Sequence, residues 1–298
     1  CGVNLALVAL SWLAIYFWRE KKELQGSILL GFAMALKCTP SLFWVYFILK
    51  REWKMALLTF LAATCFTLLP ILKLGYSESV HTFGYWTKNV MRGFQEKDPS
   101  RNISGPVPLA NMSLRPGLAR YLMHFPRDHE VRMDTPLYVD FLDLPPFTAG
   151  RIISVSMLLF LGFVAWRFRR HYPDRTDERI LWECAIISVL ILLYSPITWG
   201  QHCVGIFPGV YLLIRASMSQ QRFTRALKIG IAVFAIMVLV LNRTFIGKFY
   251  SEILSTYHTS TFLFLGLLCF LLSRHHQVTK AKTAAALGVK KVQPAEPQ

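Results

Sequence analysis

The segment Tyr194-Ser-Pro-Ile-Thr-Trp-Gly-Gln-His-Cys-Val-Gly-Ile-Phe-Pro208 is a polar stretch between two apolar runs, Ile180–Leu193 and Val204–Ile214. With their flanking residues, both runs are long enough to form most of a membrane crossing. A turn at the membrane surface needs a proline to end the helix and a tryptophan at headgroup level. It does not need Gln201 and His202 beside that tryptophan. We therefore treat this polar segment 194–208 as a candidate site, and an interfacial turn with an incidental histidine as the alternative.

The composition is typical of a helical membrane protein. The chain has 298 residues, of which 54% are hydrophobic and 14% aromatic, and its mean hydropathy is +0.39. A soluble domain of this length would not carry so many apolar runs separated by short basic loops. The net charge of +16 comes from loop Lys and Arg residues, which orient the chain and contact anionic lipid. No zinc-finger or RNA-binding motif indicates nucleic acid as a partner, so the predicted fold class is an all-α polytopic membrane protein.

The apolar runs predict the order of the membrane helices. We expect these helices over Val3–Trp18, Met55–Leu72, Phe147–Trp166, Ile180–Tyr194, Val204–Ile214, Ala226–Leu241 and Thr259–Leu272. Residues 1–272 should then form one transmembrane domain with a long extracytoplasmic loop at about 73–146, and loops of this length are usually functional. The tail, residues 273–298, is rich in Lys and Ala and is expected to be cytoplasmic and disordered.

The stretch Gly26–Leu49 poses a topology problem. As a single crossing, it would place the basic clusters Arg19–Lys22 and Lys50–Lys54 on opposite sides, against the positive-inside rule. The Lys37-Cys-Thr-Pro40 sequence in its middle favours an interrupted helix that turns back as two short helices and lines a polar cavity. One kinked helix is the alternative. With the hairpin, every short basic loop falls on one side, and the polar segment 194–208 falls on the other, together with the long loop.

The chain begins at Cys1, directly inside an apolar run and without a methionine. No positively charged region or cleavage site precedes the run, so it does not resemble a signal peptide. We read the sequence as an N-terminally truncated, C-terminal part of a longer membrane protein.

Three groups of polar residues could carry chemistry. A lysine inside an apolar stretch, such as Lys37, is costly unless an anion such as a phosphate pairs with it. A structural pair with a carboxylate from another helix is the alternative. Asn111 and Ser113 offer hydrogen bonds to sugar hydroxyls and Arg120 offers a guanidinium to phosphate, although an ordinary solvated loop would look similar.

The third group lies in the polar segment 194–208. His202 can hydrogen-bond a phosphate or a sugar, and the face of Trp199 suits a sugar ring or a polyprenyl chain. Gln201 adds a further hydrogen-bonding side chain. No carboxylate or second histidine stands at metal-ligand spacing, so no metal site is predicted.

These three groups, in this order, resemble glycosyltransferase family 87. The matching motifs are Lys37-Cys-Thr-Pro40 with Leu42-Phe43 and the basic Lys50–Lys54, then Asn111-Met-Ser-Leu114 with Arg120, then Ser195-Pro-Ile-Thr-Trp-Gly-Gln-His202. The resemblance covers roughly Gly26–Arg215. The family includes mycobacterial polyprenol-phosphate-mannose-dependent mannosyltransferases. It implies a GT-C fold, a transmembrane helix bundle in the plasma (inner) membrane with its active site on the extracytoplasmic side.

The resemblance also implies a reaction. A hexose, with mannose favoured, moves from a polyprenyl-phosphate sugar to a lipid or glycan acceptor with inversion, and no cofactor or metal is required. Members of this fold usually take their catalytic carboxylate from the first extracytoplasmic loop, so we expect the base upstream of Cys1. The groups that stabilise the leaving phosphate and orient the sugar remain in this chain. The predicted substrate-binding residues are Lys37, Asn111, Ser113, Arg120, Trp199, Gln201 and His202.

A membrane transporter or lipid-binding protein without catalysis is the competing hypothesis, because its polar groups also lie in broken helices. It predicts polar residues near the bilayer midplane and an internal repeat. The transferase predicts polar residues near one surface, beside a long folded loop. No repeat is evident in the sequence, which favours the transferase. A purely structural subunit would leave Lys37 and His202 unexplained.

Overall fold

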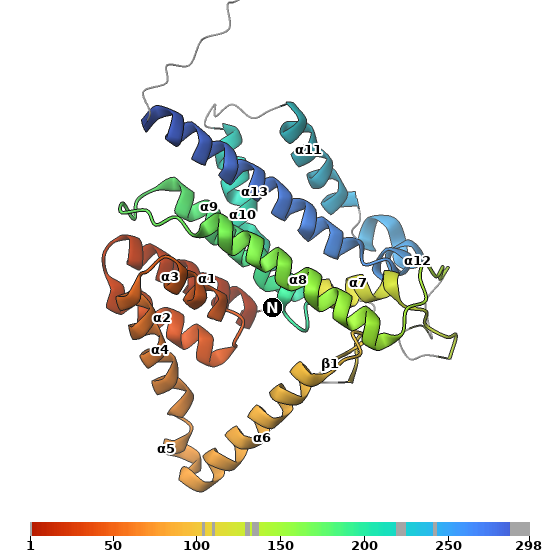
Figure 1. Ribbon diagram of the computed structural model, residues 1–298, viewed down its shortest axis with the longest axis horizontal. Coiled ribbons are helices and arrows are strands. Elements are labelled where there is room, and N and C mark those ends of the chain that lie inside the picture. The colour runs from red at the N-terminus through yellow and green to blue at the C-terminus, as the bar shows by residue number, and fades with distance from the viewer. Residues whose placement is uncertain are drawn as a thin grey trace, which may run out of the picture.

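The computed structural model describes residues 2–102, 105–108, 111–128, 132, 137–218, 225–240 and 243–286. These residues are mainly helical, which confirms the predicted all-α class (Figure 1). The helices are α1 (Gly2–Arg19), α2 (Glu23–Leu36), α3 (Ser41–Leu49), α4 (Trp53–Leu68), α5 (Ile71–Leu74), α6 (Tyr76–Gln95), α7 (Leu114–Leu122), α8 (Pro146–Phe168), α9 (Glu178–Tyr194), the 3-10 helix η1 (Gly200–Ile206), α10 (Phe207–Met218), α11 (Arg225–Val240), α12 (Arg243–Thr256) and α13 (Thr259–Ala286). Two short antiparallel strands, β1 (Arg101–Asn102) and β2 (Gly105–Pro106), complete the described elements.

The fold is that of a multi-pass membrane protein. Within the described residues, four helical stretches are long and apolar enough to cross a membrane: Gly2–Arg19, Trp53–Leu74, Pro146–Phe168 and Thr259–Ala284. The central helix is α9, which α3, α7, α10 and α13 contact. Most of its side chains are buried, because a helix that is apolar on all faces must be surrounded by others.

The chain reverses direction at Lys37–Pro40, as the hairpin hypothesis predicts. The start of α2 lies beside the start of α4, where the Ser27 hydroxyl donates to the Met55 carbonyl at 3.3 Å. The end of α3, at Leu49, is also next to the start of α4, because only residues 50–52 separate the two helices. Both ends of the α2–α3 hairpin therefore lie at the same end of the bundle. The single kinked helix is excluded.

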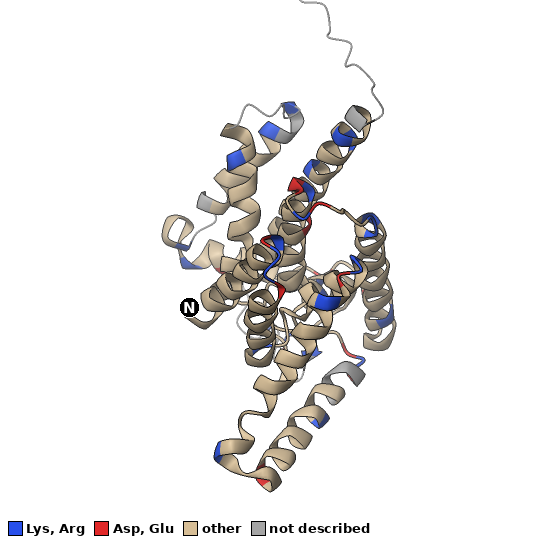
Figure 2. Ribbon diagram, turned by 90° about the vertical axis from the view of Figure 1, so that its left-hand side faces the viewer, with Lys and Arg blue, Asp and Glu red and all other residues tan. Residues whose placement is uncertain are grey.

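The basic loops meet at one end of the bundle, which we call the basic end (residues 19–23, 50–54 and 167–179). Arg175 donates to Glu23 at 2.9 Å and to Glu52 at 2.7 Å. The Lys50 ammonium donates to the Arg170 carbonyl at 2.7 Å. In Figure 2, Lys and Arg residues lie in the loops and also along the helices. Three of the basic loops therefore meet at one end of the fold, as the sequence predicts. Residues 219–224 of the basic segment after Arg215 lie outside the described residues.

The region predicted as a long loop contains regular structure. The polar, aromatic-rich α6 spans 20 residues and projects away from the main bundle in Figure 1. It starts after Gly75, whose φ of 78° ends the preceding α5. No proline interrupts residues 76–95, so a helix can propagate through a stretch whose average polarity indicates a loop.

The C-terminal tail also differs from the expected disordered segment. Helix α13 continues to Ala286, fourteen residues beyond the predicted end at Leu272. It does so because Arg274, His275 and Val278 are buried. The Lys282 ammonium also pairs with Asp177 at 3.0 Å. Packing against α9 thus stabilises a segment whose composition alone favours disorder, and residues 287–298 lie outside the described residues.

Candidate functional site

The polar segment 194–208 is held in place by the Asn111 motif. The Asn111 side-chain oxygen accepts the Thr198 N–H at 2.9 Å, and its amide donates to the Pro196 carbonyl at 3.0 Å. The backbone N–H of Met112 donates to the Thr198 carbonyl at 2.8 Å. Two motifs that are more than eighty residues apart in sequence therefore form one hydrogen-bonded unit.

Asn111 and Ser113 brace this unit. Each is 1% exposed. The N–H and the hydroxyl of Ser113 both donate to the Asn111 side-chain oxygen, at 3.0 and 2.9 Å. The side-chain oxygen of Asn111 thus accepts three hydrogen bonds and its NH2 group donates one, and neither residue lines the pocket described next. Their assignment to sugar hydroxyls stays a prediction, whereas their contacts give them a bracing function.

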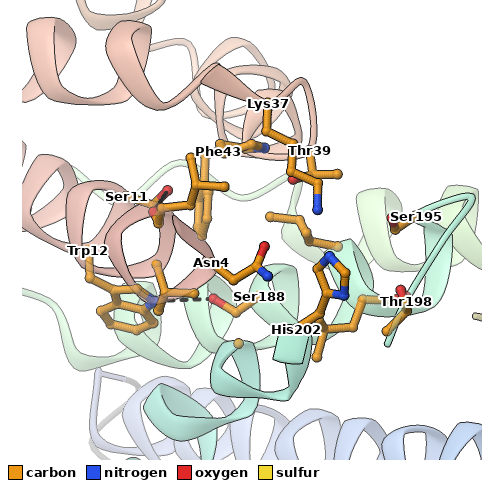
Figure 3. Close-up of a pocket in the computed structure, with 16 residues that line it drawn as sticks. Asn4, Ser11, Trp12, Lys37, Thr39, Phe43, Ser188, Ser195, Thr198 and His202 are labelled. Carbon is orange, nitrogen blue, oxygen red and sulfur yellow. Dashed lines mark hydrogen bonds between the residues drawn. The ribbon is translucent and has the colours of Figure 1, made fainter. Parts of the chain in front are cut away.

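A pocket lies between α1, the α2–α3 turn, α9 and η1 (Figure 3). It contains about 510 Å³ of space, part of which is open to the surroundings. Its polar lining consists of Asn4, Ser11, Trp12, Lys37, Thr39, Ser188, Ser195, Thr198 and His202. No Asp or Glu of the described residues lines it. The pocket therefore combines a cation and several hydrogen-bonding groups with an apolar wall.

Lys37 and His202 face each other across this pocket (Figure 3). Lys37 follows the last residue of α2, and its backbone N–H caps the helix by donating to Ala33. Its side chain is partly buried, and none of the ion pairs within the described part of the chain includes it. The alternative of a structural pair with a carboxylate is therefore not realised among those residues.

The protonation of His202 follows from its local geometry. Its Nδ1 lies 2.9 Å from the backbone nitrogen of Trp199, which donates to it. A ring that accepts at Nδ1 carries its proton on Nε2 when neutral. Burial and the charge of Lys37 both lower the pKa of His202, so the neutral ring is favoured. His202 can thus offer one N–H donor beside the ammonium of Lys37.

The other predicted site residues lie elsewhere. Trp199 is 37% exposed, Gln201 is exposed, and neither lines the pocket. Arg120 is buried in α7, where it donates to the carbonyls of Thr256 at 3.1 Å and Val139 at 2.9 Å. Its contacts therefore lie around the start of α13 rather than at the pocket.

The expected convergence of three cations is thus only partly realised. Of Lys37, Arg120 and His202, the structure brings Lys37 and His202 together and places Arg120 outside the lining. The guanidinium of Arg120 stacks on the Tyr138 ring, with 3.6 Å from its carbon to the ring centroid. Arg120 lies about two helical turns beyond Ser113 along α7, and the carbonyls of Thr256 and Val139 bind its guanidinium there. The assignment of Arg120 to a lipid phosphate stays a prediction.

Several pocket residues were not predicted because they lie inside apolar runs. Asn4 and Ser11 come from α1, and Ser188 comes from α9, where its hydroxyl accepts from the Trp12 indole N–H at 3.2 Å. The available signal was the presence of small polar residues within membrane-spanning stretches. Such residues also occur where they serve helix packing alone. Only the folded chain shows that these residues line one pocket.

The fold and pocket define a multi-pass membrane protein with a cationic pocket at the end of the bundle opposite the basic loops. The model of glycosyltransferase family 87 matches residues 2–196, which is more than half of the chain. The chain belongs to this family, as the three motifs indicated.

Relatives with known names support this membership. The chain is 25% identical over 217 residues to a polyprenol-phosphate-mannose-dependent alpha-(1-2)-phosphatidylinositol mannoside mannosyltransferase of Mycolicibacterium smegmatis, with 69% of this chain and 41% of that protein covered. A phosphatidylinositol pentamannoside mannosyltransferase of the same organism, also polyprenol-phosphate-mannose-dependent, is 25% identical over 206 residues, covering 69% of this chain and 42% of the relative.

A third relative comes from Mycobacterium tuberculosis. It is again a polyprenol-phosphate-mannose-dependent phosphatidylinositol mannoside mannosyltransferase, 27% identical over 192 residues, with 62% of this chain and 35% of the relative covered. The chain therefore spans about two fifths of the length of the curated relatives it matches. No solved structure matches.

Proposed function

We propose that this chain forms the donor-binding part of an inverting membrane hexosyltransferase. The enzyme moves a hexose, with mannose favoured, from a polyprenyl-phosphate sugar to a lipid or glycan acceptor. The reaction takes place on the extracytoplasmic face of the plasma (inner) membrane. One observation carries the proposal: Lys37 and His202 lie on one pocket whose lining, among the described residues, contains no carboxylate. The names of the relatives, which specify a polyprenol-phosphate-mannose donor, support it.

The pocket matches the needs of a phosphate leaving group. During transfer, the acceptor oxygen bonds to the anomeric carbon while the bond to the phosphate oxygen breaks, and its electron pair stays on the phosphate. The protein must stabilise this growing charge. The ammonium of Lys37 supplies a positive charge, and the Nε2–H of His202 supplies a donor that does not compete with it.

The remaining lining suits the rest of such a donor. Leu7, Val8 and Ile191 form part of an apolar wall beside the polar groups, and an isoprenoid chain can bury its surface there. A pocket near one end of the bundle suits a phosphate at headgroup level whose isoprenoid chain stays in the bilayer, which supports the proposal. A nucleotide sugar offers no comparable lipid chain for this wall.

The general base is a separate question. Deprotonation of the acceptor hydroxyl requires a group such as a carboxylate within hydrogen-bonding reach. The described lining contains none. We therefore assign donor binding to the described residues of this pocket and do not assign the base to its lining.

A donor comparison tests the proposal. The complete protein is produced in membranes that cannot make polyprenyl-phosphate sugars, and a radiolabelled sugar is then supplied on a polyprenyl phosphate or on a nucleotide. We expect labelled lipid or glycan product only with the polyprenyl-phosphate donor. Transfer from the nucleotide sugar alone would contradict the proposal. Donor binding without any transfer would favour the transporter or lipid-binding hypothesis.

A further inference from the structure

A second cavity lies at the basic end of the bundle, between the end of α8, the following loop and α13. It contains about 1040 Å³ of space that is partly open to the surroundings. Six basic residues line it: Arg167, Arg169, Arg170, His275, His276 and Lys280. Figure 2 shows basic residues along this end of α13. No described Asp or Glu belongs to the lining.

The arginines and the lysine of this cavity are not neutralised by the neighbouring carboxylates. Glu183 pairs with Lys50 at 2.8 Å. Asp177 pairs with Arg179 at 2.8 Å and with Lys282 at 3.0 Å. Within the described residues, none of the ion pairs includes an arginine or lysine of the cavity lining. Gathering like charges without counter-ions is unfavourable, so the cavity favours an anionic ligand.

One lining residue is buried and lacks a hydrogen-bond partner. His275 is 1% exposed, and neither ring nitrogen has a hydrogen-bond partner among the described residues. The Nε2 of His275 lies 3.4 Å from Glu183. Its Nδ1 has neither an ion pair nor a hydrogen bond among the described residues. A buried polar atom without a partner costs free energy, so this histidine is not explained by the contacts of the described residues alone.

The position of the cavity indicates where its ligand resides. Helix α8, one of the membrane-spanning stretches, ends at Phe168. Trp166, which also lines the cavity, is 53% exposed. An exposed tryptophan at the end of a spanning helix marks the headgroup level. Basic residues just beyond such a helix, on the side of the basic loops, attract anionic lipid headgroups.

We propose that this cavity binds the phosphate headgroup of an anionic membrane lipid. One guanidinium group can donate two parallel hydrogen bonds to two phosphate oxygens. The arginines of α8 and of the loop after it provide such groups on one wall of the cavity. Lys280 and the histidines provide further donors from α13. The site lies at the end of the bundle opposite the Lys37 pocket, so it is distinct from the proposed donor site and does not depend on that proposal.

The first test compares lipids on the unmodified protein. The complete protein is purified in neutral detergent, and retention of phosphatidylglycerol and of phosphatidylcholine is measured by native mass spectrometry. We expect phosphatidylglycerol to be retained at lower concentration than phosphatidylcholine. Equal retention of the two lipids would overturn the proposal. Displacement of the lipid by inorganic phosphate at equal concentration would also overturn it, because the ligand would then be free phosphate.

The second test uses matched variants. Arg169→Gln with Lys280→Gln removes two exposed charges of the cavity. Arg51→Gln with Lys54→Gln removes two exposed charges of the same basic end outside the cavity. We expect the first pair to weaken phosphatidylglycerol binding about tenfold or more and the second pair to change it little. Equal weakening by both pairs would indicate general surface attraction and contradict a site. Thermal unfolding of each variant checks that the fold is intact.

Discussion

Lys37 and Lys50, which lie on either side of α3, differ in whether a carboxylate pairs with them. Lys50 is 2% exposed and pairs with Glu183 at 2.8 Å, and the Tyr46 hydroxyl donates to the same carboxylate at 2.8 Å. Lys37 lies in the pocket with His202, and among the described residues it has no ion pair. An internally paired charge is explained by the fold alone. An unpaired charge beside an open pocket instead indicates the binding of an anionic ligand.

The largest expected effect comes from breaking the pair at the basic end. Lys50→Met leaves the carboxylate of Glu183 buried without its cation, which should lower the free energy of unfolding by about 3–5 kcal/mol. The double change Lys50→Met with Glu183→Met removes both charges and should restore most of the loss. Denaturation in detergent micelles measures both variants. A Lys50→Met protein as stable as the wild type would show that this pair does not stabilise the fold.

The same substitution at Lys37 should affect activity instead. We expect Lys37→Met to lower sugar transfer by about 10²-fold, as loss of one stabilising donor at a developing charge typically does. Stability should change little, because Lys37 has no ion pair among the described residues. Lys54→Met, at an exposed lysine of the basic end, is the control. Equal transfer by the Lys37 and Lys54 variants would remove Lys37 from the site.

A smaller effect on stability separates bracing from binding at Asn111. Asn111→Ala leaves the buried N–H groups of Thr198 and Ser113 without their acceptor, which should cost about 1–3 kcal/mol. Ser113→Ala removes only one hydroxyl donor and should cost less. Thermal unfolding measures both. An Asn111→Ala protein with unchanged unfolding and a raised KM for donor or acceptor would instead identify a substrate contact.

The smallest expected effect is a change in the pKa of His202. Burial and the positive charge of Lys37 both lower this pKa, so Lys37→Gln should raise it toward its ordinary value while the burial effect remains. Titration of labelled histidine by NMR measures the shift, and Lys54→Gln is the control. An unchanged pKa would mean that the two side chains do not interact.

The pH dependence of transfer follows from the same shift. Because the pKa of His202 is lowered by burial and by the charge of Lys37, the neutral ring persists to a lower pH than that of an ordinary histidine. Protonation removes the acceptor for the Trp199 N–H. We therefore expect donor affinity to change at a lower pH in the wild type than in Lys37→Gln, which lacks the positive charge that lowers this pKa. The same pH dependence in both proteins would contradict an effect of Lys37 on His202.

Sequence reasoning predicted the features that depend on local rules. The apolar runs indicated the helices, and the charges around residues 26–49 together with Pro40 predicted the hairpin. The same reversal brings Lys37 to the polar segment 194–208. The predicted link between the Asn111 motif and that segment has a physical basis, although it is formed by hydrogen bonds to backbone groups rather than by a shared pocket lining.

Features that depend on packing could not be predicted. The direction of α7 decides that Arg120 reaches the carbonyls of Thr256 and Val139, and no local pattern contains that direction. Glu183 was visible as a single acid within an apolar run, but its partner Lys50 lies 133 positions away. The extent of α13 depends on its contacts with α9, which a composition-based estimate of the tail ignores.

The α2–α3 hairpin affects any experiment that maps which compartment each loop occupies. A hydropathy window assigns one crossing to residues 26–49 and would therefore reverse the assigned compartment of every later loop. Cys38 at the tip of the hairpin is exposed, and a charged thiol reagent that cannot cross the bilayer should reach it from the compartment that contains α6.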